Sequence, residues 1–300
     1  MKPIKNISAS VRQRLLNRSK EEKRPFNELL QYYAMERFLY RLSQSAHADR
    51  FILKGALMLR VWRSPEHRPT MDIDMLGKTD NEEESVVAQV KDIMGTDVEP
   101  DGLLFDFDSV HSERITEDAD YEGVRIKFRG LLDSARVNMQ IDIGFGDVVY
   151  PEPEESDLPT MLDFPAPKLL CYSRESAIAE KFEAMVTLGV LNSRMKDFYD
   201  IWLLSRQFGF ERAKLAEAIR LTFKRRGTTL PIVIDAFEED FVAAKQIQWA
   251  AFCRRLKQDH LSTSFQVIVS DVASFLAPIA SSIPQGTFTF STWEPAGPWK

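Results

Sequence analysis

The sequence has little cysteine and little histidine. Its 300 residues include only two cysteines, Cys171 and Cys253, and neither has a cysteine or histidine nearby at metal-ligand spacing. So few cysteines argue against a disulfide scaffold and fit a reducing compartment. The 4 histidines are scattered along the chain, and we therefore expect no zinc site.

Long apolar runs and a targeting segment are also lacking. No run of about eighteen apolar residues occurs, so we expect no membrane span. The first residues, Met1-Lys-Pro-Ile-Lys-Asn, lack the apolar core of a signal peptide. With 44% hydrophobic and 28% charged residues, the composition is typical of a globular protein, and we expect a cytoplasmic location.

Charge is unevenly distributed. The net charge of −6 argues mildly against indiscriminate nucleic-acid binding. Acidic residues concentrate in 80–122 and 147–157, whereas basic residues concentrate near the N-terminus and at 224–226. The N-terminal basic residues are Lys2, Lys5, Arg12, Arg14, Arg18, Lys20, Lys23 and Arg24. A polyanion could dock on the basic parts, although solvated helix faces are an equal alternative.

Hydrophobic periodicity predicts an α+β protein. Residues 8–48 fit two helices. Strand patterns occupy 51–54, 71–76, 103–107, 123–128 and 137–145, with a helix at 82–94. The Pro- and acid-rich stretch 151–167 is typical of a linker or long loop. Helical patterns then occupy 175–190, 195–208, 211–224, 234–258 and 264–278.

The most informative segment is 51–76. A short apolar run ends at Gly55, an apparent helix follows, and a strand-like stretch then carries Asp72 and Asp74. Alternate side chains of a strand share a face, so both carboxylates would point the same way. Neighbouring carboxylates repel each other and Asp is a poor strand former, so something should offset this cost. A divalent cation is the simplest candidate, and oxygen ligands of this kind suit Mg²⁺.

The small residues Gly55 and Ala56 favour the same interpretation. Before a helix, they would let the backbone approach a phosphate, whose charge the helix N-terminus attracts. The alternative is a surface β-hairpin whose polar face happens to carry two Asp residues. Because Asp-x-Asp follows the small pair, the segment predicts a metal-dependent nucleotide site.

Asp142 is the candidate for a third carboxylate, on the polar face of the predicted strand 137–145. If that strand lies beside the strand of Asp72 and Asp74, three acids converge. They could then hold two Mg²⁺ ions about 3.5–4 Å apart, which would stabilise an in-line displacement at a phosphate. Asp147 is a weaker competitor because the strand is ending there.

Charged side chains also lie near the apolar stripes of two predicted helices. Lys181 flanks one stripe, where it either snorkels outward or points into a cleft. Asp197 lies in line with the next stripe, and Asp200 lies at its edge. Helix capping is one alternative for these acids, but Ser193 offers a better N-cap. We therefore expect Asp197 to act at the site.

Together these residues resemble a nucleotidyltransferase of the polymerase-beta-like superfamily. More narrowly, they resemble the AbiEii/AbiGii toxin family of bacterial abortive-infection and toxin–antitoxin systems. The matching segments, within residues 5–210, are Leu53-Lys54-Gly55, Arg68-Pro69-Thr70, Glu180-Lys181 and Arg194-Met195-Lys196-Asp197-Phe198-Tyr199-Asp200. One departure is Ala56, which stands where the superfamily usually has Ser or Gly and offers a phosphate no hydroxyl.

The resemblance implies roles for individual residues. Asp72, Asp74 and Asp142 would bind Mg²⁺ and act in catalysis. Lys181 would bind the triphosphate, and Asp197 would orient Lys181 or the incoming base or ribose. Further nucleotide contacts are expected from Lys54, Gly55, Ala56, Arg68, Thr70, Arg194 and Lys196. For Thr70 the alternative is that its hydroxyl holds an Asp.

The implied fold is α+β, with a small mixed β-sheet nucleotidyltransferase core, N-terminal helices and a C-terminal helical domain. The expected parts are an N-terminal helical segment (1–50), the core (51–165), the helical domain (166–285) and an irregular tail (286–300). The two halves are expected to form the active-site cleft between them.

The implied activity is transfer of NMP from an NTP to an acceptor hydroxyl, with release of pyrophosphate. The resemblance points to RNA as acceptor, above all the 3′ end of tRNA, with growth arrest as the consequence. It also implies a separately encoded antitoxin. Two alternatives stay open: transfer to a small molecule or protein side chain, and a non-catalytic nucleotide-binding module.

Overall fold

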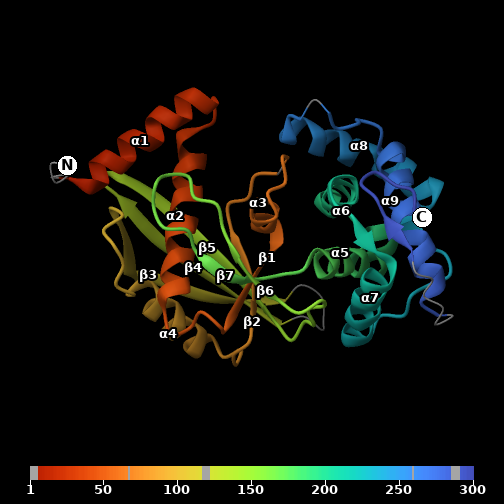
Figure 1. Cartoon of the computed structure of the whole chain (residues 1–300), viewed down its shortest axis with the longest axis horizontal. Helices are drawn as coiled ribbons and strands as arrows, with labels where there is room; N and C mark the ends of the chain where they lie inside the picture. Colours follow the sequence, from red (N-terminus) through yellow and green to blue (C-terminus); the bar gives the residue numbers. More distant parts are fainter. Residues whose placement is uncertain (1–5, 67, 117–121, 259, 285–290) are drawn as a thin grey trace. The chain divides into compact units, whose positions relative to one another are not determined.

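The chain forms two compact units in this computed structural model. The described residues are 6–66, 68–116, 122–258, 260–284 and 291–300. The first unit comprises Met1–Gly146 and Glu154–Cys171, and the second comprises Asp147–Pro153 and Tyr172–Lys300 (Figure 1). The first unit holds a mixed sheet and the second is mainly helical, which confirms the predicted α+β class.

The first unit is built on a seven-stranded sheet in the order β3-β4-β5-β2-β1-β7-β6. The strands are β1 (Phe51–Lys54), β2 (Ile73–Gly77), β3 (Leu103–Thr116), β4 (Glu122–Leu132), β5 (Ala135–Phe145), β6 (Glu154–Asp157) and β7 (Lys168–Cys171). β2 runs parallel to β5 and antiparallel to β1, and β1 runs parallel to β7. The chain therefore places β2 in the middle of the sheet, between two strands remote from each other in sequence.

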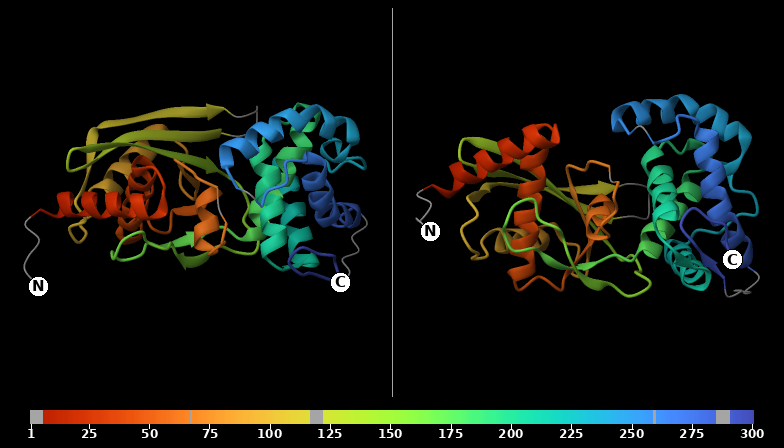
Figure 2. Two further views of the ribbon diagram at one scale, coloured as in Figure 1. Left: turned by 90° about the horizontal axis from the view of Figure 1, so that it is seen from above. Right: turned by 45° about the horizontal axis from the view of Figure 1, so that its top comes forward.

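Helices cover one face of this sheet. They are α1 (Ile7–Glu22), α2 (Phe26–Gln44) and α4 (Glu83–Met94), with the short α3 (Met58–Val61) after a 3₁₀ turn at Gly55–Leu57. α2 packs on β5 and β7, and α4 packs on β3 (Figure 2). Along β5, Met139 and Ile141 are buried while Asn138 and Asp142 remain accessible. The buried side chains meet the helices by strand alternation, and the polar ones line the opposite face.

The second unit is a cluster of helices. They are α5 (Arg174–Leu188), α6 (Met195–Gln207), α7 (Arg212–Arg226), α8 (Glu239–Leu256) and α9 (Phe265–Ser282), with 3₁₀ turns at Gly189–Leu191 and Asp235–Phe237. A two-stranded sheet joins β8 (Phe210–Glu211) to β9 (Thr292–Trp293). Trp293 is buried against Phe275 of α9, with ring centroids 4.9 Å apart.

The α9 helix is long and apolar enough, by length and composition alone, to cross a membrane. Half of it is buried inside the protein, where it packs on α6, α7 and α8. A single helix of this kind is weak evidence for a membrane span, because a core helix passes the same test.

The structure departs from the sequence predictions in several places, and the strands β7 and β8 were not predicted. β2 begins at Ile73, so Met71 and Asp72 precede the strand, and Met71 is 52% exposed. The predicted linker contains β6, which pairs with β7. In the segment expected to be an irregular tail, Thr292–Trp293 forms β9, while residues 286–290 lie outside the described residues.

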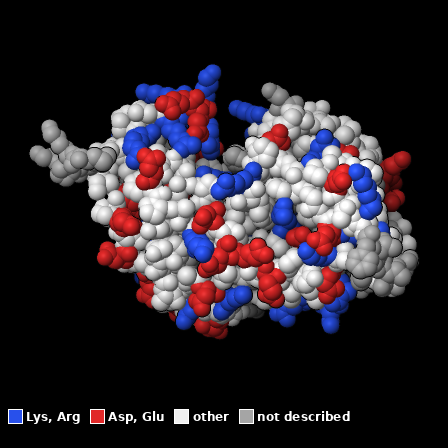
Figure 3. All heavy atoms as spheres, in the orientation of Figure 1, with Lys and Arg blue, Asp and Glu red and all other residues white. Residues whose placement is uncertain are grey.

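Part of the basic N-terminal segment is paired with acids. Arg18 pairs with Glu22, and Arg24 pairs with Glu28 at 2.8 Å. Figure 3 shows basic and acidic side chains mixed over the end of α1 (upper left). Lys2 and Lys5 lie outside the described residues. This segment therefore fits the alternative of a solvated helix face better than a site for a polyanion.

Candidate metal and nucleotide site

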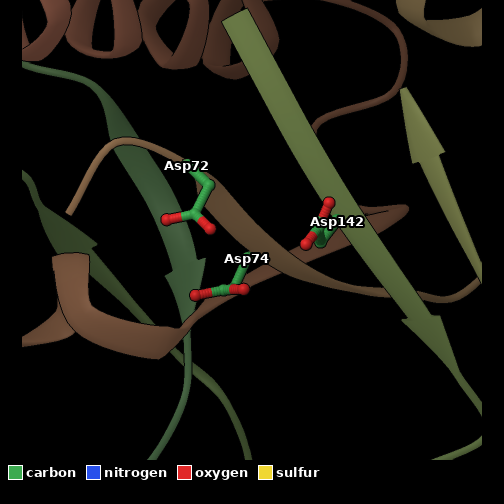
Figure 4. Close-up of side chains that lie close together, drawn as sticks. All are labelled: Asp72, Asp74 and Asp142. Carbon is green, nitrogen blue, oxygen red and sulfur yellow. The ribbon is translucent and has the colours of Figure 1, made fainter. Parts of the chain in front are cut away.

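Three carboxylates converge in the first unit, those of Asp72, Asp74 and Asp142, and together we call them the carboxylate group. The parallel register of β2 and β5 places Asp74 directly opposite Asp142. Asp72 lies just before β2, and its carboxylate turns toward the other two (Figure 4). One oxygen from each of the three lies within 4.8 Å of the others, and all three residues are half-buried. The sequence predicted this convergence on condition that the two strands are neighbours, which they are.

Gly55 is required by the position of Asp74. β1 ends at Lys54, which lies opposite Asp74 in the antiparallel register, and Gly55 follows with a φ of +73°. A Cβ atom on Gly55 would lie 1.9 Å from Asp74 Oδ2, so only glycine fits beneath the carboxylate. This close approach is a second reason for glycine here, in addition to the phosphate approach expected from the sequence.

Thr70 holds Asp72. The Thr70 hydroxyl donates a hydrogen bond of 2.5 Å to Asp72 Oδ1, and the Thr70 N–H donates to the Tyr32 hydroxyl at 3.1 Å. Burial raises the pKa of Tyr32 above its usual value, so that hydroxyl stays neutral. Gln31, which like Tyr32 belongs to α2, donates a hydrogen bond of 2.8 Å to the Met71 carbonyl. The irregular segment before β2 is thus fixed to α2, which orients the carboxylate.

Asp142 has a partner that the sequence analysis did not single out. Arg125 of β4 lies opposite Asp142 and donates two hydrogen bonds of 2.7 Å, one to each carboxylate oxygen. These bonds raise the pKa of the guanidinium above its usual value. Gln140 adds contacts of 3.2 Å to both oxygens. The alternation of β4 put Arg125 on its polar face, but only the register between strands pairs it with Asp142.

Asp147, the weaker competitor for third carboxylate, belongs to the second unit. Arg226 contacts it at 3.1 Å, and its side chain is 5% exposed. Arg226 also pairs with Glu183 at 2.8 Å. Asp147 is therefore part of a buried ion-pair cluster within the helical unit rather than of the carboxylate group.

Another charged cluster in the helical unit, which we call the Lys181 cluster, lies where α5 meets α6. Lys181 Nζ lies 2.8 Å from Asp200 Oδ2 and 3.3 Å from Asp197 Oδ1. Both acids are buried, and Lys181 keeps 18% of its side chain exposed. Arg194 Nε contacts Asp197 at 2.6 Å. The structure thus brings together Lys181, Asp197 and Arg194, and it places Asp200 in direct contact with Lys181.

The predicted N-cap of α6 is wrong. The helix begins at Met195 rather than after Ser193, and its N-cap residue is Arg194. Asn192 accepts a hydrogen bond of 2.8 Å from the Arg194 N–H instead. The N-cap residue makes no side-chain hydrogen bond to the helix. The two buried acids of α6, Asp197 and Asp200, contact cations.

The remaining predicted residues lie as follows. Lys54 and Arg68 are half-buried in the first unit, and Ala56 is 4% exposed within the 3₁₀ turn that follows β1. Lys196 is exposed at the start of α6. Ala56 contributes backbone groups but no hydroxyl to its surroundings.

The carboxylate group fits a magnesium ion. Its donors are hard oxygens, and half-burial leaves room for the water and phosphate oxygens with which Mg²⁺ completes its octahedron. The outer contacts from Thr70 and Arg125 fix the donors, as such contacts commonly do in metal sites. The chain can therefore hold a divalent cation at Asp72, Asp74 and Asp142.

Comparison with solved structures shows the same fold in two proteins of Helicobacter pylori. One is described as a "putative nucleotidyltransferase": it is 14% identical, with a TM-score of 0.51, covering 87% of this chain and 98% of that one. The other, JHP933, is 13% identical, with a TM-score of 0.50, covering 86% and 94%. A search among curated proteins gives no match.

A family model supplies the assignment. The model described as "Nucleotidyl transferase AbiEii toxin, Type IV TA system" matches residues 37–271. This range includes the carboxylate group and the Lys181 cluster. Membership of this family implies an NTP substrate and an antitoxin partner. The chain is a nucleotidyltransferase and belongs to the AbiEii toxin family of type IV toxin–antitoxin systems.

Proposed function

We propose that this nucleotidyltransferase uses Mg²⁺ to transfer NMP from an NTP to the 3′ end of tRNA, and that this arrests growth. The observation that supports the proposal is the convergence of Asp72, Asp74 and Asp142 on neighbouring strands. The proposed setting is the cytoplasm, where the antitoxin that the family implies would restrain the enzyme.

The three carboxylates have different roles in this proposal. Asp72 and Asp74 hold the metal on the nucleotide side, and Asp142 polarises the attacking hydroxyl or shares a second metal. Bound Mg²⁺ supplies charge neutralisation at the phosphate oxygens. The acceptor oxygen forms a bond to the α-phosphorus while the bond to the β-phosphate oxygen breaks, and pyrophosphate leaves. Asp142 accepts a hydrogen bond from the acceptor hydroxyl and takes up the proton that the hydroxyl loses.

The Lys181 cluster binds the triphosphate in this proposal. Lys181 offers a compact positive charge, and its two acid partners hold the ammonium in one place. Arg194 and Lys196 contribute further charge. In the first unit the proposed nucleotide contacts are the backbone of Gly55–Ala56 and the side chains of Lys54 and Arg68, while Thr70 acts through Asp72.

The test is a transfer assay with purified protein, Mg²⁺, total tRNA and each α-labelled NTP in turn. Asp72→Ala is the matched inactive variant. We expect label to appear on tRNA with one preferred NTP, in the presence of metal, and with the wild type alone. Nucleotide binding without any transfer to RNA would contradict the tRNA proposal and direct the search to other acceptors.

The net charge of −6 favours a second candidate, transfer to a small molecule or protein side chain. The two candidates differ in salt dependence. Phosphate contacts make RNA binding weaken steeply with salt, whereas a neutral acceptor would show little dependence. Repeating the assay over a range of salt concentrations separates them.

A further inference from the structure

A groove of about 730 Å³ lies in the first unit, beside the carboxylate group. Its walls come from β3, β4, β5, the first turns of α2 and Met71. Lys127, Arg129 and Arg136 line it, and no Asp or Glu is among its described lining residues. The charged side chains among its described lining residues are therefore all cations, although Glu113 and Asp106 contact two of them from outside the lining.

Two lining residues of the groove adjoin the carboxylates. Met71, at one edge, directly precedes Asp72, and its side chain is 52% exposed. Gln140, another lining residue, contacts both oxygens of Asp142 at 3.2 Å. A molecule lying in the groove would therefore present one end to Asp142.

The groove is long enough for a chain of nucleotides. Arg136, Asn138, Gln140 and Asp142 alternate along the accessible face of β5. Positions 136 and 140, which both line the groove, are roughly 13 Å apart at the rise of a strand, and this exceeds the length of one nucleotide. The pairing of β2 starts at Ile73 opposite Ile141, so residues 136–140 of β5 extend past the start of β2.

The lining cations can exchange their partners for phosphate. Lys127 contacts Glu113, and Arg129 contacts Asp106, both at 2.8 Å. These pairs are at the surface, with side chains 27–51% exposed, and such pairs contribute little to stability. Arg136 is exposed, and within the described part of the chain no carboxylate pairs with it.

On the basis of the proposed function, we propose that this groove binds the single-stranded 3′ end of the RNA acceptor. The phosphates lie along Arg136, Arg129 and Lys127, and the terminal hydroxyl reaches Asp142. A small molecule bound at the carboxylates would not reach cations that lie this far from them. The groove thus specifies a polynucleotide acceptor rather than a metabolite.

The test uses charge reversal and direct binding. The anisotropy of a fluorescent single-stranded RNA is measured with the full chain in the absence of NTP, at several salt concentrations. We expect Arg136→Glu to weaken RNA binding about tenfold and to lower the slope of log affinity against log salt by about one. Arg136→Lys should retain most of the affinity. Lys78→Glu, an exposed cation outside the groove, should change neither quantity.

The outcomes separate this inference from the proposed function. The proposal that the groove binds RNA would be overturned by either of two results. One is equal RNA affinity for the wild type and Arg136→Glu, and the other is no binding of RNA by the wild type. A wild type that transfers NMP to tRNA, with an acceptor KM that Arg136→Glu leaves unchanged, would also overturn it while the proposed function stands. If no NMP transfer occurs at all, the proposed function fails, and the binding measurement still decides whether the groove takes RNA.

Discussion

Arg125 and Asp142 face each other across β4 and β5 and are joined by two hydrogen bonds of 2.7 Å. A bidentate guanidinium fixes both the position and the rotation of a carboxylate. It also competes with a cation for the oxygens of that carboxylate. Arg125 therefore positions the acid proposed to receive the acceptor hydroxyl, and it sets how strongly that acid attracts metal.

Replacing Arg125 should separate these two effects. In Arg125→Gln, Asp142 loses its fixed orientation, so kcat should fall about tenfold. The Mg²⁺ concentration for half-maximal activity should fall as well, because a competing cation is gone. Arg125→Lys should recover little, since an ammonium cannot make the bidentate contact. Steady-state kinetics over a metal titration measures both quantities, and an unchanged kcat would show that Asp142 needs no such support.

Gly55→Ala should disrupt the carboxylate group directly. The new Cβ would lie 1.9 Å from Asp74 Oδ2, so the carboxylate must move, and we expect turnover to drop at least a hundredfold. The matched control is Gly227→Ala, which has a similar φ of +69° but no atom within 4 Å of the new Cβ. Both variants should lose about 1 kcal/mol of stability from backbone strain. Gly55→Ala should lose more because of its clash with Asp74, and only Gly55→Ala should lose activity. Thermal unfolding alongside kinetics checks this, and equal activity losses would contradict it.

Thr70→Val should weaken metal binding. It keeps the shape of the side chain but removes the hydrogen bond to Asp72. Loss of such an outer contact typically costs 10–100-fold in metal affinity, so the Mg²⁺ requirement should rise by about that factor. Thr70→Ser should restore the requirement, because the hydroxyl returns. If Thr70 bound phosphate instead, the variant would raise the KM for NTP and leave the metal titration unchanged.

Lys181→Gln should raise the KM for NTP about tenfold or more, because it removes the charge proposed to bind the triphosphate. It also leaves the buried Asp200 without its 2.8 Å partner, which should lower stability. The double variant Lys181→Gln/Asp200→Asn also removes the negative charge of Asp200. It should recover thermal stability but not NTP affinity. Recovery of both would mean that Lys181 serves the fold alone.

The two cysteines should differ in reactivity. Burial raises the pKa of the Cys171 thiol to about 12, and the residue is 4% exposed. Only the thiolate reacts, so Cys171 should resist alkylation of the native protein at mildly alkaline pH. Cys253 is less buried, and burial raises its pKa as well, so it should react slowly. Mass spectrometry of native and denatured samples distinguishes the two, and rapid native labelling of Cys171 would show that the sheet opens.

Much of the fold follows from local pattern. The alternation of β5 and the helical spacing from 175 onward set the faces of these elements within the chain itself. β6 was missed because Glu154–Asp157 carries no apolar alternation and pairs only because β7 lies beside it. The strand that carries Asp74 was predicted to begin two residues too early, at Met71, because hydrogen bonds from Thr70 and Gln31 fix residues 70–72 outside the sheet.

The sequence by itself determined that Asp74 and Asp142 lie on the polar faces of their strands and that a small-residue turn precedes Asp74, because strand alternation and glycine conformation are local. Only the tertiary structure decided that Asp74 lies opposite Asp142, that Arg125 clamps Asp142, and that Asp147 belongs to another unit. These relationships depend on the register between strands far apart in the chain. That register is set by the packing of buried faces against helices such as α2, which no short stretch of sequence contains.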